Sequence, residues 1–338
     1  MILAGDVGGT KTNVGFFQVE GHGRSLRVTS VVEQTYHSRE HASLDELALA
    51  FLNQHKLQAS VACFGVAGPV RHGHSQATNL PWTIDAARLT AELRVERTLL
   101  INDLEANAWG VAQLDERDFA VLNQGAADSE GNAAVISAGT GLGEAGLYWD
   151  GRRHLPFGCE GGHADFSPRN ALESGLLAFL LEEFGHASWE RVLSGPGLHN
   201  VYRYLCRIKP GAESPEVARE IATGDPPAVI SLAAQQGCCP ICTEAMGLFV
   251  SLYGAEAGNL ALKLMATDGV YLGGGIAPKN VAALRQGDFM RSFAAKGRMR
   301  PVLEAVPVRV ILSAKAALLG AARCAATRSP LAPQAEGP

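Results

Sequence analysis

Two glycine-rich stretches decide the fold of this 338-residue chain: Asp6-Val7-Gly8-Gly9-Thr10 near its start, and Gly139-Thr140-Gly141-Leu142-Gly143 about 130 residues later. Each follows a short apolar run and leads into a second one, a pattern that predicts strand, turn and strand. Glycine has no Cβ, so such turns expose backbone N–H groups that can hydrogen-bond to phosphate oxygens. Two copies indicate a duplicated α/β chain that holds a nucleoside triphosphate from two sides.

The composition limits the class of protein and its partners. The length predicts about two domains, and 47% hydrophobic with 19% charged residues provides ample core. A net charge of −5 without a Lys/Arg run argues against nucleic acid as a partner. The most apolar long stretch, 245–266, carries Glu256, Asn259 and Lys263, so we expect a buried helix and no membrane span.

The cysteines and the N-terminus predict a cytoplasmic protein. The seven cysteines are odd in number and mostly scattered, as expected for reduced thiols. No basic region followed by a long apolar run is visible at the N-terminus, so no secretory signal is expected. The single C-x-x-C, Cys239 to Cys242, has no second ligand pair close by, which makes a zinc site a weak hypothesis.

Apolar runs and turn residues predict strands that alternate with helices, and hence mostly parallel sheets with ligands beyond the carboxyl ends of the strands. Strands are expected at 2–4, 13–20, 25–35, 60–66, 97–101, 269–272 and 306–312, and helices at 44–55, 84–93 and 314–326. A loop is expected from 67 to 82, a helix start at Ala106 and a largely helical region at 174–265. Ser194-Gly195-Pro196-Gly197 is interpreted as a helix-breaking turn, and 329–338 as a disordered tail.

Six motifs follow one another in a recognisable order. They are Asp6-Val7-Gly8-Gly9-Thr10, Ile101-Asn102-Asp103, Gly139-Thr140-Gly141-Leu142-Gly143, Glu160-Gly161-Gly162-His163, Glu190-Arg191-Val192-Leu193-Ser194-Gly195-Pro196-Gly197 and Leu272-Gly273-Gly274-Gly275. With them the chain resembles the bacterial ATP-dependent glucokinases over residues 2–326. The resemblance implies a two-domain actin-like ATPase (ribonuclease-H-like) α/β fold, with duplicated βββαβα-type cores around a central cleft. We expect a small domain at 1–113 plus 313–328, a large domain at 114–312, and a homodimer.

The resemblance implies transfer of the γ-phosphoryl of ATP to the C6 hydroxyl of D-glucose with Mg²⁺, the first step of glycolysis. Two alternatives remain open: a kinase for mannose or an N-acetylhexosamine, and a non-enzymatic sugar-sensing regulator. A regulator would need an N-terminal DNA-binding helix pair, for which Asp6 leaves no room. The phosphoryl donor could also be ADP or polyphosphate. The related repressor/ORF/kinase group has a Cys-rich zinc motif after its catalytic His, whereas here Ala164-Asp165-Phe166 follows, which favours the zinc-free branch.

Asp6 and the glycines are the expected nucleotide site. Asp6 at a strand end could hold Mg²⁺, usually through water, because this hard ion prefers oxygen ligands; alternatively it only caps its own turn. The resemblance places the second turn on phosphates and the third glycine cluster against adenosine, although that cluster could be a tight turn for packing alone. The expected ATP-binding residues are Asp6, Gly8, Gly9, Thr10, Gly139, Thr140, Gly141, Gly273, Gly274 and Gly275.

The spacing from Gly141 to Gly146 also matches G-x-G-x-x-G. A dinucleotide site would need a helix to begin at those glycines. The following Leu147-Tyr148-Trp149 instead continues a strand pattern, so we reject a nicotinamide cofactor.

Asp103 is the candidate catalytic base. It ends an apolar strand, and a carboxylate there could accept the proton of an attacking hydroxyl; by spacing alone, N-capping the next helix is as good an explanation. Glu160 and His163 have the spacing of metal ligands on an α-helix. The flanking glycines disfavour an α-helix here, so a metal site is a weak hypothesis. The resemblance assigns the hexose to Asn102, Asp103, Glu160, His163 and Glu190, and Asn79 is a further candidate.

Overall fold

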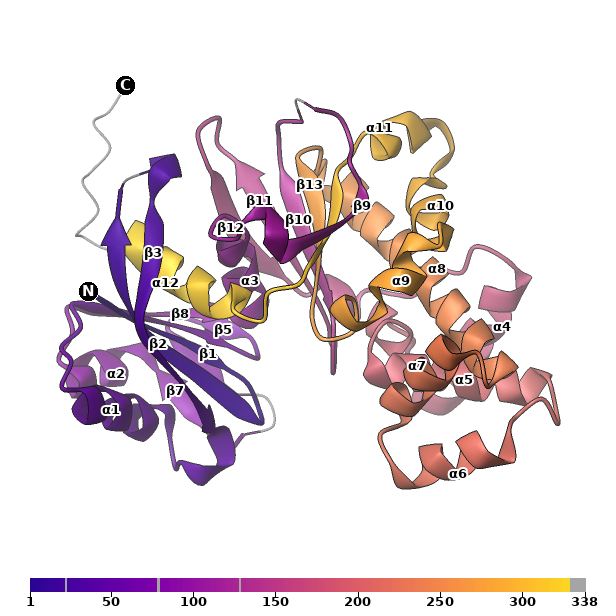
Figure 1. The fold of residues 1–338 in the computed structure, drawn as a ribbon, viewed down its shortest axis with the longest axis horizontal. Helices are drawn as coiled ribbons and strands as arrows, with labels where there is room; N and C mark the ends of the chain where they lie inside the picture. The colour runs from indigo at the N-terminus through magenta and orange to yellow at the C-terminus, as the bar shows by residue number, and fades with distance from the viewer. Residues whose placement is uncertain (22, 78–79, 128, 329–338) are drawn as a thin grey trace. The chain divides into compact units, whose positions relative to one another are not determined.

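The computed structural model describes residues 1–21, 23–77, 80–127 and 129–328 (Figure 1). Asn79 and the predicted disordered tail at 329–338 lie outside these residues. The protein has an α/β fold with mixed sheets and, in the described part of the chain, twelve α-helices. It divides into two compact units: residues 1–118 with 147–158 and the segment from Ser313 onward, and residues 119–146 with 159–312.

The first unit contains a five-stranded sheet in the order β3-β2-β1-β4-β8. Its strands are β1 (Ile2–Val7), β2 (Lys11–Glu20), β3 (Arg27–His37), β4 (Val61–Val66) and β8 (Arg97–Asn102). β1, β4 and β8 run parallel, whereas β2 and β3 are antiparallel to their neighbours. The expectation of a mostly parallel sheet was therefore wrong, because the first glycine turn makes β1 and β2 a hairpin.

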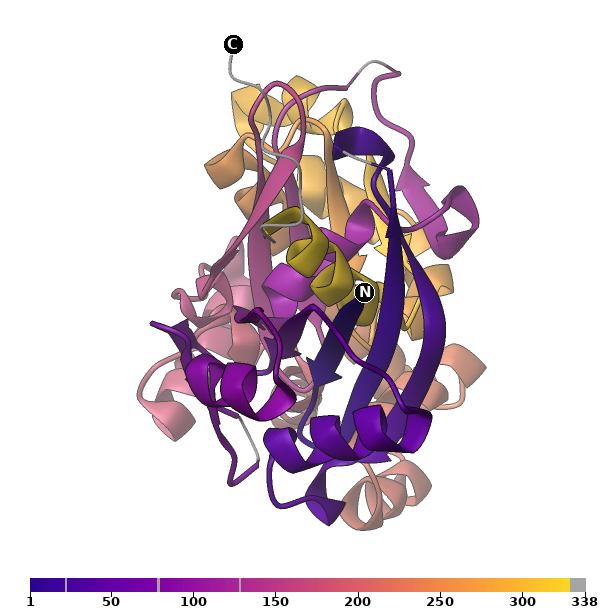
Figure 2. The same cartoon turned by 90° about the vertical axis from the view of Figure 1, so that its left-hand side faces the viewer.

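Alternating side chains of these strands bury two opposite faces. On β1, Leu3 and Val7 belong to one core cluster and Ile2 and Ala4 to another. The first cluster includes helices α1 (Leu44–His55) and α2 (Ala86–Leu93), and the second includes α3 (Asp103–Val111) and α12 (Ala316–Arg328). The sheet thus lies between two helix pairs (Figures 1 and 2).

Several boundaries in the first unit differ from those expected, for local reasons. The predicted helix at 44–55 is confirmed as α1, whose N-cap Ser43 accepts from Glu46 N–H. The helix expected at 84–93 begins only at Ala86, because Asp85 caps it. The expected loop at 67–82 contains two short strands, β5 (Val70–Arg71) and β6 (His74–Gln76), which form a small sheet with β7 (Thr83–Asp85) just after it.

A six-stranded mixed sheet has the order β12-β11-β10-β13-β14-β9, and most of its strands belong to the second unit. Residues 147–158, which are the end of β11 and nearly all of β12, are counted with the first unit. The strands of this sheet are β9 (Phe119–Asn123), β10 (Ala133–Ala138), β11 (Leu142–Trp149), β12 (His154–Cys159), β13 (Gly269–Gly273) and β14 (Val308–Ile311). The second glycine turn joins neighbouring strands β10 and β11, as predicted. A strand, not a helix, follows it, which confirms the rejection of the dinucleotide motif.

Helices dominate the middle of the second unit, as expected for 174–265. They are α4 (Ala171–Phe184), α5 (Gly195–Ile208), α6 (Pro215–Thr223), α7 (Pro226–Gln236) and α8 (Pro240–Leu264). Three short helices follow β13: α9 (Val281–Arg285), α10 (Asp288–Ala294) and α11 (Arg300–Glu304). The prediction that α8 is buried is confirmed, since most of its residues belong to the core. Among the described residues, no single helix is both long enough and apolar enough to cross a membrane. Only α7 and α8 taken together reach that length and apolarity, and they are bent by 104° relative to each other.

Ser194 to Gly197 was wrongly interpreted as a helix-breaking turn, because it starts α5. The Ser194 hydroxyl caps the helix by accepting a hydrogen bond from Gly197 N–H at 3.0 Å. Pro196 lies in the first turn, where a missing N–H costs nothing because the helix has no acceptor for it.

Two glycines set the distance between α3 and α12. A Cβ on Gly320 would overlap with the carbonyl oxygen of Ala106, and one on Gly110 would overlap with that of Ala316. We therefore predict that Gly320→Ala lowers the free energy of unfolding by about 1–3 kcal/mol, through overpacking against backbone. Urea denaturation measures the change.

Gly247→Ala is the matched control. Gly247 lies inside α8, and nothing would lie within 4 Å of an added Cβ. Alanine should leave stability unchanged or raise it by up to about 1 kcal/mol. Equal effects of the two substitutions would contradict close helix packing at Gly320.

Candidate active site

The first glycine turn is held by its own backbone and by a neighbouring serine. Gly8 N–H donates to Lys11 O at 3.0 Å, and the Ser38 hydroxyl donates to Gly8 O at 2.7 Å. Ser38 N–H donates to Thr10 O, so both strands of the turn are fixed. These bonds form the turn without the Asp6 carboxyl, so that group need not serve as a cap.

The Asp6 carboxyl accepts a hydrogen bond from the Asn13 amide at 3.3 Å, and the Thr35 hydroxyl orients that amide by donating to its oxygen at 2.8 Å. Burial raises the pKa of Asp6, an effect that the Asn13 bond only partly opposes. A divalent cation would favour the ionised form of this carboxyl, and its oxygens are the ligand type that Mg²⁺ prefers. Asp6 therefore fits the magnesium role.

Parallel pairing brings Asp6 to the same sheet edge as Asn102 and Asp103. In the register of β1, β4 and β8, Asp6 pairs with Gly65, which pairs with Ile101. Two strand spacings separate Asp6 from Ile101, about 10 Å. The candidate metal ligand and the candidate base thus lie at the carboxyl ends of neighbouring parallel strands.

The helix after β8 begins earlier than expected, at Asp103 rather than Ala106. Asn102 is its N-cap: its side-chain oxygen accepts from Leu104 N–H at 2.8 Å, and its amide donates to Gly68 O at 3.2 Å. Asp103 is the first helical residue and also accepts from Leu104 N–H, at 3.0 Å. Capping therefore involves both residues, with Asn102 in the capping position.

In the second unit, three glycine segments meet through their backbones. Gly139 O accepts from Gly195 N–H at 2.8 Å, and Ala138 O accepts from Ile276 N–H at 3.2 Å. Gly274 has a φ of +79°, and a Cβ there would overlap with Ala138 O. The second glycine turn, the start of α5 and the end of β13 therefore form one continuous surface of backbone.

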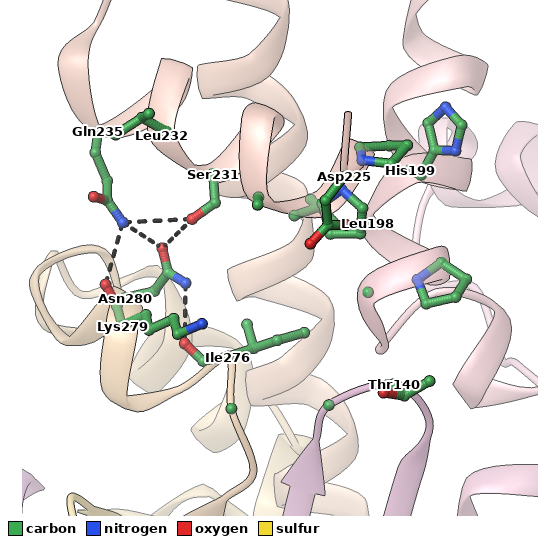
Figure 3. Close-up of a pocket in the computed structure, with 17 residues that line it drawn as sticks. Thr140, Leu198, His199, Asp225, Ser231, Leu232, Gln235, Ile276, Lys279 and Asn280 are labelled. Carbon is green, nitrogen blue, oxygen red and sulfur yellow. Dashed lines mark hydrogen bonds between the residues drawn. The ribbon is translucent and has the colours of Figure 1, made fainter. Parts of the chain in front are cut away.

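A cavity of about 890 Å³ opens beside this surface (Figure 3). Thr140 lies at the tip of the glycine turn on one side. The apolar residues that line the cavity include Leu198, Leu232 and Ile276. The volume and mixed lining suit a nucleotide-sized ligand. Gly139, Thr140 and Gly275 were predicted here, but the contribution of α7 was not.

An amide network closes the far wall of this cavity. Asn280 accepts from the Ser231 hydroxyl at 2.9 Å and from the Gln235 amide at 3.0 Å, and its own amide donates to Ile276 O at 3.0 Å. These bonds fix the turn at 276–280 to α7, as the dashed lines in Figure 3 show. No motif in the sequence signals this network, because its members are ordinary polar residues at helix spacing.

The two predicted sugar loops are also brought together in the second unit. Gly161–His163 forms a single 3-10 turn and no α-helix, as expected from the flanking glycines. Trp189 N–H donates to Ala164 O at 3.0 Å, which joins this loop to the one that carries Glu190. Glu190 accepts from Leu142 N–H at 2.9 Å, while Glu160 and His163 lie 4.0 Å apart. The carboxylates and the imidazole thus project from paired loops.

Solved structures that are similar to this chain include glucokinases. A glucokinase from an Antarctic psychrotroph has a TM-score of 0.83 and 29% identity, covering 96% of this chain and 98% of its own. A ROK family glucokinase from Streptomyces griseus, in complex with glucose and AMPPNP, shares the fold with a TM-score of 0.63 and 21% identity, covering 96% and 98%.

The chain belongs to the glucokinase family, because a sequence model of that family matches residues 3–328. The glucokinase of Trichormus variabilis is 40% identical over 341 residues, covering 96% of this chain and 99% of the relative.

We predict that Asn280→Ala loosens the turn at 276–280. Removing the amide leaves Ile276 O without its side-chain donor and takes one acceptor from both Ser231 and Gln235, at a cost of about 1–3 kcal/mol. Hydrogen exchange of residues 276–280 should accelerate, and the free energy of unfolding should fall. Lys279→Ala is the control, because Lys279 has an exposed side chain and contributes only its backbone oxygen. Similar exchange in both variants would refute the role of Asn280.

Proposed function

We propose that this protein is an ATP-dependent glucokinase (EC 2.7.1.2), which transfers the γ-phosphoryl of ATP to the C6 hydroxyl of D-glucose. The observation that carries the proposal is the sheet edge where Asp6 and the Asn102–Asp103 pair share the carboxyl ends of parallel strands. Membership of the glucokinase family supports it, and so does the S. griseus relative, whose complex contains glucose and an ATP analogue.

Nucleotide binding is assigned to backbone donors in both units. Gly8, Gly9 and Thr10 would bind the terminal phosphates in the first unit, and Gly139, Thr140 and Gly141 would do so in the second. Gly273, Gly274 and Gly275 would contact adenosine beside the cavity that α7 lines. Asp6 would hold Mg²⁺ through water, and the ion would neutralise phosphate charge.

Hexose binding is assigned to Asn102, Asp103, Glu160, His163 and Glu190. Carboxylates accept hydrogen bonds from hydroxyls, and the imidazole can donate or accept. A sugar that lacks a matching hydroxyl leaves these groups unpaired, which is the basis for selecting glucose over other hexoses.

The chemical step requires little from the protein beyond position and proton transfer. The Asp103 carboxylate takes the proton of the C6 hydroxyl as the oxygen attacks the γ-phosphorus in line, and ADP leaves. Asp103 is the first residue of α3, so the helix fixes its position at the end of β8.

The finer architecture, location and assembly are part of the same proposal. The two units are proposed to be duplicated βββαβα-type cores, supported by strand orders that each place a hairpin pair beside parallel strands. A cytoplasmic location at the first step of glycolysis is supported by seven cysteines that are all free thiols. A homodimer stays a prediction from the family.

The test is Asp103→Ala. Loss of the base should lower kcat by roughly 10²–10⁴-fold while glucose still binds, because other groups hold the sugar. Production of ADP and glucose 6-phosphate measures turnover, and calorimetry measures glucose binding. Asp115→Ala, which removes a solvent-exposed carboxylate, is the control and should match the wild type. If Asp103→Ala keeps kcat within a few-fold of wild type, Asp103 is not the base.

A further inference from the structure

The first residues of β11 lie beneath every sugar residue assigned to the second unit. Leu142 N–H donates to Glu190, and a Cβ on Gly162 would overlap with Leu142 O. Two residues on, the Glu144 carboxyl contacts Gly161 so closely that a Cβ there would overlap with Glu144 Oε2. Gly161 and Gly162 therefore rest directly on β11, and Glu160 and His163 flank them.

Glu144 is an unusual residue to find in this position. It is only 1% exposed, and among the described residues its buried Oε1 atom has no hydrogen-bond partner. A second buried carboxyl, Glu256 on α8, is close enough to raise the pKa of Glu144. A buried carboxylate without a donor would cost free energy, so a proton is expected on one member of this pair.

The hydrogen bonds decide which carboxyl carries the proton. Glu256 accepts from the Asn259 amide at 2.7 Å and from the Lys263 ammonium at 3.2 Å, one at each oxygen. Both donors favour its ionised form. Glu144 has no such donor, and burial together with Glu256 raises its pKa to about 7. Glu144 is therefore the member of the pair that takes up the proton, and it is mainly protonated below about pH 7.

Other groups face Glu144 from the elements packed around it. From α8 these are Glu256, Lys263 and Tyr253, and from the end of β12 it is Cys159. Lys263 is the one cation among these four, and it is already paired with Glu256. Deprotonation of Glu144 thus adds a negative charge to a buried acidic neighbourhood.

We propose that Glu144 is a positioning residue whose protonated carboxyl keeps Gly161 and Gly162 on β11, and so holds Glu160 and His163 in the arrangement that binds a hexose. Ionisation would draw water to the carboxylate or turn it away from Glu256, and either change displaces Gly161, which has no free space above Glu144. The inference rests on the proposed function, since it takes these loops to bind the sugar.

The sign of the pH dependence follows from the protonated state. Glu144 supports the loop fully when the pH is below its pKa. This support is lost as the pH rises through that pKa. Wild-type KM for glucose should therefore rise about tenfold from pH 6 to pH 8.5, the effect of a one-unit difference in pKa between free and sugar-bound enzyme. The kcat at saturating glucose should change much less.

Glu144→Gln tests the proposal, because glutamine keeps the shape of a neutral carboxyl but cannot ionise. Its KM should therefore rise clearly less than that of the wild type over this pH range, because only the part of the rise that Glu144 causes is removed. Glu256→Gln should move the wild-type rise to lower pH, because it removes the neighbouring negative charge, and this variant carries the test if Glu144→Gln does not fold. Coincident KM profiles for wild type and Glu144→Gln would overturn the inference.

Hydrogen exchange of residues 160–164, corrected for intrinsic rates, separates this inference from the proposed function. Wild-type protection of the loop should fall from pH 6 to pH 8.5 and that of Glu144→Gln should not, whether or not glucose is the substrate. Equal loss of protection in both proteins refutes the positioning role, whereas absence of glucose turnover at every pH refutes only the glucokinase assignment.

Discussion

Close approach of one backbone to another, at positions where a side chain would not fit, is the constraint on which both halves of the site depend. At the second glycine turn, Gly139 O accepts from Gly195 N–H, and Gly274 lies against Ala138 O. These contacts join three distant parts of the sequence into one surface of N–H and C=O groups. In the first unit the same constraint sets α12 against α3, through Gly110 and Gly320. The chemistry then needs only a few side chains on this frame.

Strand register supplies the second constraint, because it places those side chains. Asp6 and the Asn102–Asp103 pair lie at one sheet edge because β1, β4 and β8 are parallel and in register. In the second unit the start of β11 performs a comparable task, since Leu142 and Glu144 lie beneath the loops that carry Glu190, Glu160 and His163. One strand thus connects the second glycine turn, which is proposed to bind phosphates, to the loops that are proposed to bind the sugar. We infer from this connection that the ionisation of a core carboxyl can affect sugar affinity.

Patterns with short range were predictable from the sequence, and those that depend on tertiary contacts were not. Both strand–turn–strand units, α1 and the burial of α8 were predicted because apolar spacing and glycine act locally. The start of α5 was misjudged, since Ser194-Gly195-Pro196-Gly197 can end one helix or cap the next. The Asn280 network and the Glu144–Glu256 pair gave no signal, because their meaning depends on partners far apart in the chain. The assigned roles of the site residues stay predictions.

Steady-state turnover of the purified protein, with a panel of hexoses against ATP, ADP and polyphosphate, tests the central claim most directly. The account predicts that glucose with ATP gives the highest kcat/KM. Glucose 6-phosphate and ADP should form in equal amounts, and mannose and N-acetylhexosamines should be poor acceptors. Faster turnover of another hexose, or glucose binding without ADP formation, would contradict it.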